Sequence, residues 1–188
     1  MFRLTPIDPS TATGKAKELL DGVQAALGVT PNLIRTMAQS PSVLDAYLAL
    51  SKALSAGTFS AALQEQIALT VAGENHCDYC ASAHTLVGRK EGVGEDELAA
   101  NLQGRSSDPH TQAILTLAQA IVTKRGFVSD QDLADARLAG VGDAEIAEVT
   151  AGVAKNIFSN YFNHVAQTEV DFPHVSAGEA EAATAAAA

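Results

Sequence analysis

Residues 65–84 read EQIALTVAGENHCDYCASAH, and this stretch decides the fold because it holds the end of one helix and the start of another. Upstream of the cysteines, the larger apolar residues lie largely toward one side of a helix: Leu63, Ile67, Leu69 and Val71. Ser60 is a good residue type for the start of this helix. The pattern predicts a helix from about residue 60 to residue 75.

A second helix follows almost at once. Asp78 is a residue type that assists a helix start, whereas Gly88 and Gly92 are residue types at which helices fray or end. Cys77 is therefore expected at or just before a helix N-terminus.

The side chains of Cys77, Cys80 and His84 share one face of this second helix. Each helical residue turns by about 100°, so Cys80 lies about 60° from Cys77, and His84 returns to within about 20° of it. His84 also follows Cys80 at the i, i+4 spacing, at which helical side chains meet. The spacing predicts a C-x-x-C-x-x-x-H cluster that can act as one unit.

Thiol redox chemistry needs such a cluster. Only the thiolate is nucleophilic, and an adjacent imidazole can accept the thiol proton directly or through one water. A helix N-terminus adds partial positive charge that favours the thiolate. Attack on a peroxide gives a sulfenic acid, and a second thiol within reach condenses with it to a disulfide. Glu65, on the preceding helix, can orient the imidazole of His84.

The pattern E-x11-C-x2-C-x3-H, formed by Glu65, Cys77, Cys80 and His84, resembles the alkylhydroperoxidase D-like group of the carboxymuconolactone decarboxylase superfamily. The resemblance covers about residues 40–105, and the segment NIFSNYFNHVAQTEVDFP resembles a peroxidase-related branch. It implies an all-α fold, homo-oligomers such as dimers, trimers or hexamers, and peroxiredoxin-type reduction of hydrogen peroxide or small organic hydroperoxides.

The resemblance also implies individual roles. Glu65 and His84 would form a proton relay to Cys80, the attacking thiol, and Cys77 would resolve the sulfenic acid. Electrons would come from a dithiol donor such as a lipoylated protein. Some relatives have a histidine immediately before the second cysteine, where this chain has Tyr79, so Tyr79 is an auxiliary candidate.

The whole chain reads as a single-domain, all-α bundle over residues 1–174, followed by a poorly ordered Ala/Glu-rich tail over residues 175–188. Three helix starts combine a capping residue with a following proline: Thr30-Pro31, Ser40-Pro41 and Asp108-Pro109. Further helices are predicted near 95–102 and 109–125, from Ser129 with Asp132 in the first turn, and from Asp143 to about Thr168.

The composition excludes several classes. The formal net charge of −10 disfavours nucleic acid as a partner. The N-terminus lacks a secretory pattern and no apolar run would span a membrane, so a cytoplasmic location is expected. The chain has two cysteines, spaced as in intracellular redox or metal sites. No Gly-rich phosphate loop follows a strand, and we expect neither a cofactor nor a metal.

Three alternatives remain open. The first is a decarboxylase that acts on a lactone acid, as the superfamily's name suggests, although members of that branch generally lack the cysteine pair. The chain can also be a non-enzymatic assembly module, or a zinc site in which His76 or Glu65 joins the cluster as fourth ligand.

A polar stripe on the last helix is the remaining candidate. Asn156, Asn160 and His164 recur every four residues. We favour a solvent-facing or subunit-facing edge for this stripe. The alternative is that Asn160 and His164 approach the thiols and act as auxiliary residues.

Overall fold

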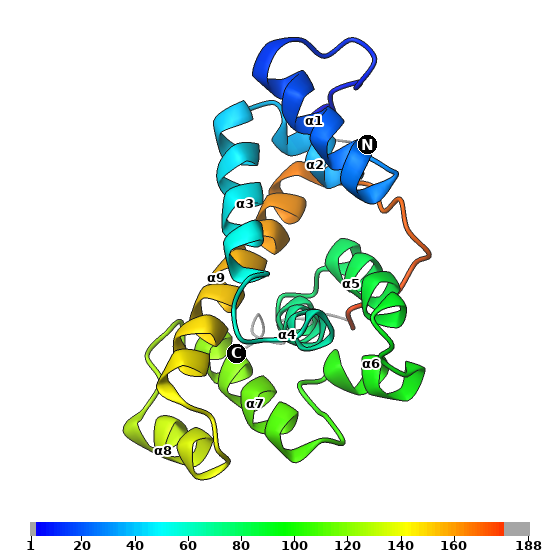
Figure 1. Cartoon of the computed structure of the whole chain (residues 1–188). Coiled ribbons are helices and arrows are strands. Elements are labelled where there is room, and N and C mark those ends of the chain that lie inside the picture. The colour runs from blue at the N-terminus through cyan, green and yellow to red at the C-terminus, as the bar shows by residue number, and fades with distance from the viewer. Residues whose placement is uncertain (1–2, 179–188) are drawn as a thin grey trace, which may run out of the picture.

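The computed structural model describes residues 3–178, and within that range it contains helices and no strand (Figure 1). The predicted all-α fold is confirmed. The helices in chain order are α1 Gly14–Leu27, α2 Asn32–Met37, α3 Pro41–Leu54, α4 Ala61–Glu74, α5 Asp78–Lys90, α6 Glu95–Asn101, α7 Pro109–Thr123, α8 Asp130–Leu138 and α9 Asp143–Ala166.

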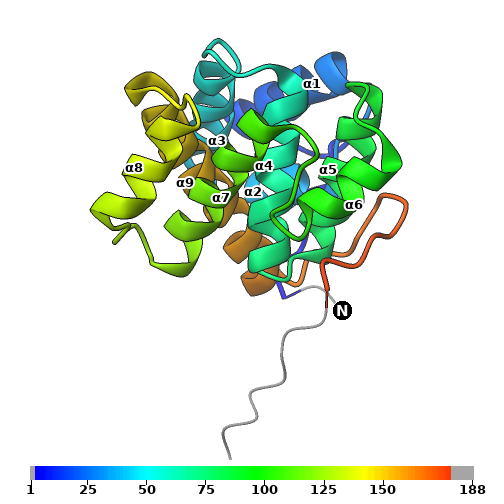
Figure 2. The same cartoon turned by 90° about the horizontal axis from the view of Figure 1, so that it is seen from below.

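Helix α4 lies in the middle of the bundle, and α5, α6, α7 and α9 pack around it (Figures 1 and 2). Every residue from 66 to 73 is buried. The expectation of one apolar side was therefore too narrow, since a helix enclosed by neighbours is buried all round. Small residues such as Ala68, Ala72 and Gly73 let the surrounding helices approach closely.

The predicted helix starts at Ser40-Pro41 and Asp108-Pro109 are confirmed. Helix α2 begins one residue later than Thr30-Pro31 suggested, because Pro31 has an extended backbone and takes the N-cap position. Its first amide, that of Asn32, donates instead to the Asp171 carboxylate, at 2.8 Å. A distant segment thus supplies the cap that the local sequence lacks.

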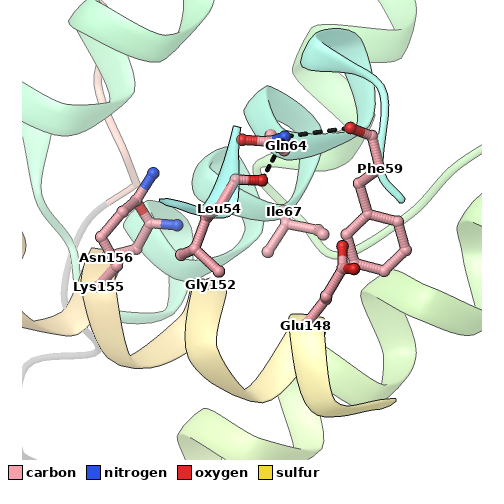
Figure 3. A pocket seen from close by; sticks show the side chains of 8 residues that line it. All are labelled: Leu54, Phe59, Gln64, Ile67, Glu148, Gly152, Lys155 and Asn156. Carbon is pink, nitrogen blue, oxygen red and sulfur yellow. Dashed lines mark hydrogen bonds between the residues drawn. The ribbon is translucent and has the colours of Figure 1, made fainter. Parts of the chain in front are cut away.

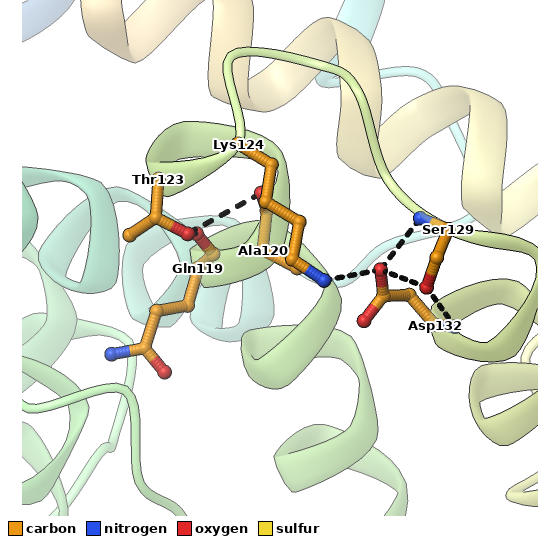
Figure 4. A network of polar contacts seen from close by, with 6 residues as sticks. All are labelled: Gln119, Ala120, Thr123, Lys124, Ser129 and Asp132. Atoms are coloured by element: carbon orange, nitrogen blue, oxygen red, sulfur yellow. Dashed lines mark hydrogen bonds and ion pairs between the residues drawn. The ribbon is translucent and has the colours of Figure 1, made fainter.

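Helix α8 is fixed to the end of α7 by a small polar network (Figure 4). The predicted start at Ser129 is confirmed, because Ser129 and Asp132 form a reciprocal capping box. Lys124 adds an ion pair to the same carboxylate oxygen and, with Ser129, lowers the pKa of Asp132 to about 2.

The segment after α9 runs back along α5 (Figures 1 and 2). Helix α9 ends where Gln167 adopts a left-handed backbone, close to the predicted end. Farther on, the amide of Val175 donates to Ser82 and that of Ala177 to Asp78, at 2.9 and 2.8 Å. These contacts lie in the first residues of the predicted tail, and residues 179–188 lie outside the described part of the chain.

Two hydrophobic clusters flank α4. One joins α7, α8 and α9, and the other joins α1, α2, α3, the C-terminal segment and the first turns of α5, including both cysteines. Over the part of the chain that the structure covers, no helix combines the length and hydrophobicity needed to cross a bilayer.

The close packing of α4 against the end of α6 predicts that Gly73→Ala destabilises the protein. A Cβ at this position would overlap the carbonyl oxygen of Leu102, which is backbone and cannot turn aside. We expect the free energy of unfolding to fall by about 2 kcal/mol in urea titrations. Gly22→Ala is the control, because its Cβ meets no atom within 4 Å. There we expect a gain of about 0.5–1 kcal/mol. Equal effects at both positions would contradict the packing argument.

Candidate active site

The turn between α4 and α5 sets the position of the first cysteine. The amide of His76 donates to Gly73 and that of Cys77 to Ala72, at 3.1 and 3.0 Å. With His76 at a φ of 52°, these bonds form a Schellman motif, which satisfies the last carbonyls of α4. Cys77 becomes the N-cap of α5, as the sequence indicated, and His76 is exposed.

The two sulfur atoms lie side by side at this helix end. Cys77 and Cys80 are 1% and 2% exposed, both thiols are free, and their Sγ atoms are 2.8 Å apart. The backbone amide of Cys80 also donates to the Cys77 sulfur, at 3.4 Å. The pair is therefore buried, adjacent and placed where a helix N-terminus favours negative charge.

The two thiols are electrostatically unequal. The hydrogen bond from Cys77 lowers the pKa of Cys80 to about 7, against the effect of burial, and His84 and Asn163 contribute in the same direction. The same hydrogen bond, together with burial, raises the pKa of Cys77. Cys80 is therefore the thiol that ionises near neutral pH, and Cys77 keeps its proton.

The imidazole of His84 is held by Glu65 across the α4–α5 contact. His84 Nδ1 lies 2.7 Å from Glu65 Oε2, and each side chain is 17% exposed. A carboxylate only accepts, so Nδ1 carries the proton and Nε2 is the free base. Burial lowers the pKa of His84, but the charge and hydrogen bond of Glu65 outweigh it, so the pKa is raised. The raised pKa makes His84 a better acceptor for a proton, and positive charge on the imidazole favours the thiolate of Cys80.

Asn163, which sequence reasoning missed, contacts both sulfurs. Its Nδ2 lies 3.3 Å from the Cys80 sulfur and 4.0 Å from that of Cys77. Asn163 is buried, and its donated hydrogen bond favours the thiolate of Cys80. Helix α9 thus reaches across the bundle to the thiols.

The expectation that the polar stripe on α9 faces solvent or another subunit is therefore wrong for Asn156 and Asn160. Asn156 and Asn160 are buried, whereas His164 is exposed and stacks on Tyr161. Two steps of four residues rotate a side chain by about 80°, which carries His164 off the face that Asn156 begins. A step of seven residues returns to within about 20°, which places Asn163 on that face. The spacing of the three asparagines contained this signal.

Asn160 is wholly buried and is oriented by a neighbour from the α4–α5 turn. Its Oδ1 accepts from Asn75 Nδ2, at 2.9 Å. Asn160 also contributes to lowering the pKa of Cys80. Its amide nitrogen consequently faces the thiol side of the site.

The side chain of Tyr79 points to α2 and to the C-terminal segment, where it contacts Leu33 and Phe172. Its hydroxyl accepts from the amide of Leu33 in α2, at 3.1 Å, and its ring meets Phe172 edge-on, with ring centres 5.4 Å apart. Burial raises the pKa of Tyr79. Tyr79 thus ties α5 to α2 and to the C-terminal segment.

Two further groups that the sequence did not single out approach the relay. Burial raises the pKa of Tyr47 to about 12, and the negative charges of Cys80 and Glu65 add to the effect. Lys155 of α9 borders a cleft (Figure 3), where burial lowers its pKa and Glu65 opposes that shift. Tyr47 stays a protonated donor, and Lys155 lies on the Glu65–His84 side of the site.

Metal binding was weighed as an alternative for this cluster. Among the described residues, there is no group of at least three His, Cys, Asp or Glu side chains that could hold a metal ion. Glu65 and His84 are bonded to each other, and His76 is exposed.

Replacing Glu65 by glutamine is expected to raise the pKa of Cys80. Glu65 raises the pKa of His84, so E65Q lowers it, and the imidazolium that favours the thiolate is lost as a consequence. The rate of alkylation by iodoacetamide as a function of pH measures the Cys80 pKa. The matched control is Glu145→Gln, which changes a second His–Glu pair, with His110. A similar shift in both variants would contradict the relay.

Replacing Asn163 by alanine removes the amide that donates to the Cys80 sulfur. The pKa of Cys80, about 7 in the unmodified chain, is expected to rise by about one unit, because a hydrogen bond to a charged group contributes about 1.5–3 kcal/mol and part of it is recovered from water. The same alkylation assay provides the measurement. An unchanged or lower pKa would show that Asn163 does not stabilise the thiolate.

Part of the chain matches the model of a known protein family. Residues 41–108 match the carboxymuconolactone decarboxylase family. Comparison with curated proteins gives no match.

Solved structures resemble the chain over most of its length. One is described as an alkylhydroperoxidase AhpD core, an uncharacterised peroxidase-related protein from Ralstonia eutropha JMP134, with 23% identity and a TM-score of 0.79 over 90% of this chain and 92% of that one. The debrominase Bmp8 is similar at 22% identity and a TM-score of 0.76, over 90% and 92% of the two chains. Another is a peroxidase-related protein from Silicibacter sp. TM1040, at 22% identity, a TM-score of 0.74 and coverage of 89% and 92%.

These likenesses confirm the resemblance found in the sequence. Residues 41–108 are similar to the carboxymuconolactone decarboxylase family, and the fold of the chain is that of the alkylhydroperoxidase AhpD core.

Proposed function

We propose that the protein is a thiol peroxidase in which Cys80 attacks the peroxide and Cys77 resolves the product. The observation that carries the proposal is the unequal pair of adjacent sulfurs. Cys80, beside His84 and Asn163, has its pKa lowered to about 7, whereas the pKa of Cys77 is raised. A nucleophile and a protonated second thiol are what a dithiol peroxidase needs.

The first half of the cycle is oxidation. The proton of Cys80 moves to His84, which Glu65 keeps oriented and basic. The thiolate attacks one peroxide oxygen, the O–O bond breaks, and Cys80 becomes a sulfenic acid. The departing hydroxide or alkoxide takes the proton from His84 and leaves as water or an alcohol.

The second half joins the two cysteines. The Cys77 thiol attacks the Cys80 sulfenic acid, and a disulfide and one water are formed. The 2.8 Å between the sulfurs makes Cys77 the nearest thiol for this step. A dithiol donor, such as a lipoylated protein, then reduces the disulfide by thiol exchange. We place this cycle in the cytoplasm, where the compartment is reducing, and in a homo-oligomer.

The proposal predicts different fates for the two cysteine variants. Peroxide treatment of the unmodified protein is expected to remove two hydrogens from the intact mass, through a Cys77–Cys80 disulfide. Cys80→Ser should abolish peroxide consumption. Cys77→Ser should leave a Cys80 sulfenic acid that dimedone traps and that excess peroxide over-oxidises. Unchanged peroxide consumption by Cys80→Ser would refute the proposal.

The same Cys80→Ser variant separates the rival activities. A muconolactone-type acid and 2,3,4-tribromopyrrole, the compound bound in a structure of a Bmp8 variant, are the substrates to test. A decarboxylase that makes no use of the thiols would turn over the lactone acid equally well with and without Cys80. Turnover of either compound by a protein that consumes no peroxide would contradict our assignment.

A further inference from the structure

His110, in the first turn of α7, is hydrogen-bonded through both nitrogens of its ring. Nε2 lies 3.0 Å from Glu145 Oε1 in α9, and Nδ1 lies 3.4 Å from the carbonyl oxygen of Ala139, the residue that follows α8. These three helices lie side by side at one end of the bundle (Figures 1 and 2). One side chain therefore joins α7, α8 and α9.

A neutral imidazole cannot make both of these bonds. The neutral ring has one N–H group and, on its other nitrogen, one lone pair. Both partners of His110, a carboxylate oxygen and a backbone carbonyl oxygen, only accept. Whichever nitrogen holds the single proton, the other nitrogen turns its lone pair toward an acceptor. The imidazolium, which has a proton on each nitrogen, satisfies both contacts.

The charged groups around the ring favour the same protonation state. The hydrogen bond of Glu145 raises the pKa of His110 against the effect of burial, and the charges of Glu145 and Asp108, the N-cap of α7, add to the rise. The partial positive charge of the α7 N-terminus acts in the opposite direction. The cation nearby in α8, Arg137, is balanced by Asp143 of α9, at 2.9 Å. The ring thus faces two carboxylates from α7 and α9.

Glu145 also caps α9. Its Oε2 accepts from the amide of Gly142, at 2.8 Å, while its Oε1 faces His110. On the other side of the same connection, the amides of Gly140 and Val141 donate to the last turn of α8. The short segment 139–142 is therefore held by the end of α8 and by the pair of Glu145 and His110.

We propose that His110 is a pH-dependent clamp that holds the α8–α9 connection to the start of α7. With the proton on, the ring bonds to both Ala139 and Glu145. When the proton leaves, one of the two bonds is lost, and the connection opens locally more often. The start of α8 is fixed separately, by Lys124 and Asp132 (Figure 4). The clamp is independent of the peroxidase function, because α9 contacts the thiols near its other end.

The sign of the pH effect follows from the raised pKa. Since the pKa of His110 is higher in the folded chain, its stabilising contribution is complete below the unfolded-state pKa, about 6.5, and is lost as the pH rises through the folded-state pKa. The pKa of His84 is also raised, so the pH dependence of the unmodified protein contains both groups. Comparison with a His110 variant at each pH isolates the clamp.

The first test measures the ring directly by NMR. The resonances of His110 are those that are missing from the spectrum of His110→Gln. In the unmodified protein we expect the pKa of His110 to lie above about 6.5. In Glu145→Gln, which retains an acceptor for Gly142 but loses the negative charge, this pKa should fall. A pKa at or below about 6.5 in the unmodified protein, or no fall in Glu145→Gln, would overturn the clamp.

The second test measures amide hydrogen exchange in residues 139–142. At about pH 5.5 we expect these amides to exchange about fivefold faster in His110→Gln than in the unmodified protein, because charge-assisted hydrogen bonds are lost. At about pH 8.5 the two proteins should exchange at nearly equal rates, because the neutral imidazole no longer holds both partners. A ratio of rates that does not change between the two pH values would contradict the proposal.

His164→Gln is the matched control. His164 also lies on α9, but it is exposed near the other end of the helix, where it stacks on Tyr161. Its replacement should leave exchange at residues 139–142 as in the unmodified protein at both pH values. An equal effect of His164→Gln and His110→Gln would show that the pH dependence does not come from the clamp.

Discussion

Burial of α4 on all sides is the constraint on which the rest of the molecule depends. Four helices pack around it, residues 66–73 are all buried, and a Cβ at Gly73 would overlap the backbone of Leu102. Because α4 cannot shift, both of its ends are fixed. Glu65 at one end is held against His84, and the turn at the other end delivers Cys77 to the start of α5. The separation of the carboxylate from the thiols is thus set by the length of one buried helix.

The electrostatics of the site follow from this enclosure. Charges attract more strongly where water is excluded, so the charge of His84 adds to the hydrogen bond from Cys77 in lowering the pKa of Cys80. When one of the two thiols ionises, the other keeps its proton, and the groups around the pair determine which sulfur becomes the thiolate. The hydrogen bond from Cys77, with His84 and Asn163, favours the thiolate of Cys80 and lowers its pKa to about 7.

The sequence predicted much of this arrangement, and its failures have physical reasons. The spacing of Cys77, Cys80 and His84 placed them on one helix face because helical geometry is local. The start of α2 was misplaced by one residue because its cap comes from Asp171, far along the chain. Asn163 was missed because only the four-residue step was followed along α9, and its partner, which lies on another helix, could not be identified from the sequence. The fold class could be predicted from periodicity, but the long-range polar contacts could not.

The burial of both sulfurs has different consequences for the oxidant and for the reductant of the proposed cycle, because the two differ in size. The oxidant is a small peroxide, whereas the reductant is a dithiol donor that can be a whole protein. A protein-sized reductant cannot touch sulfurs that are 1% and 2% exposed, so it acts only on molecules that have opened locally. The segment bonded to α5 through Val175 and Ala177 lies beside both cysteines and shares their hydrophobic cluster. In the proposed cycle, the apparent affinity for such a donor falls in proportion to the fraction of molecules that have opened locally around the cysteines.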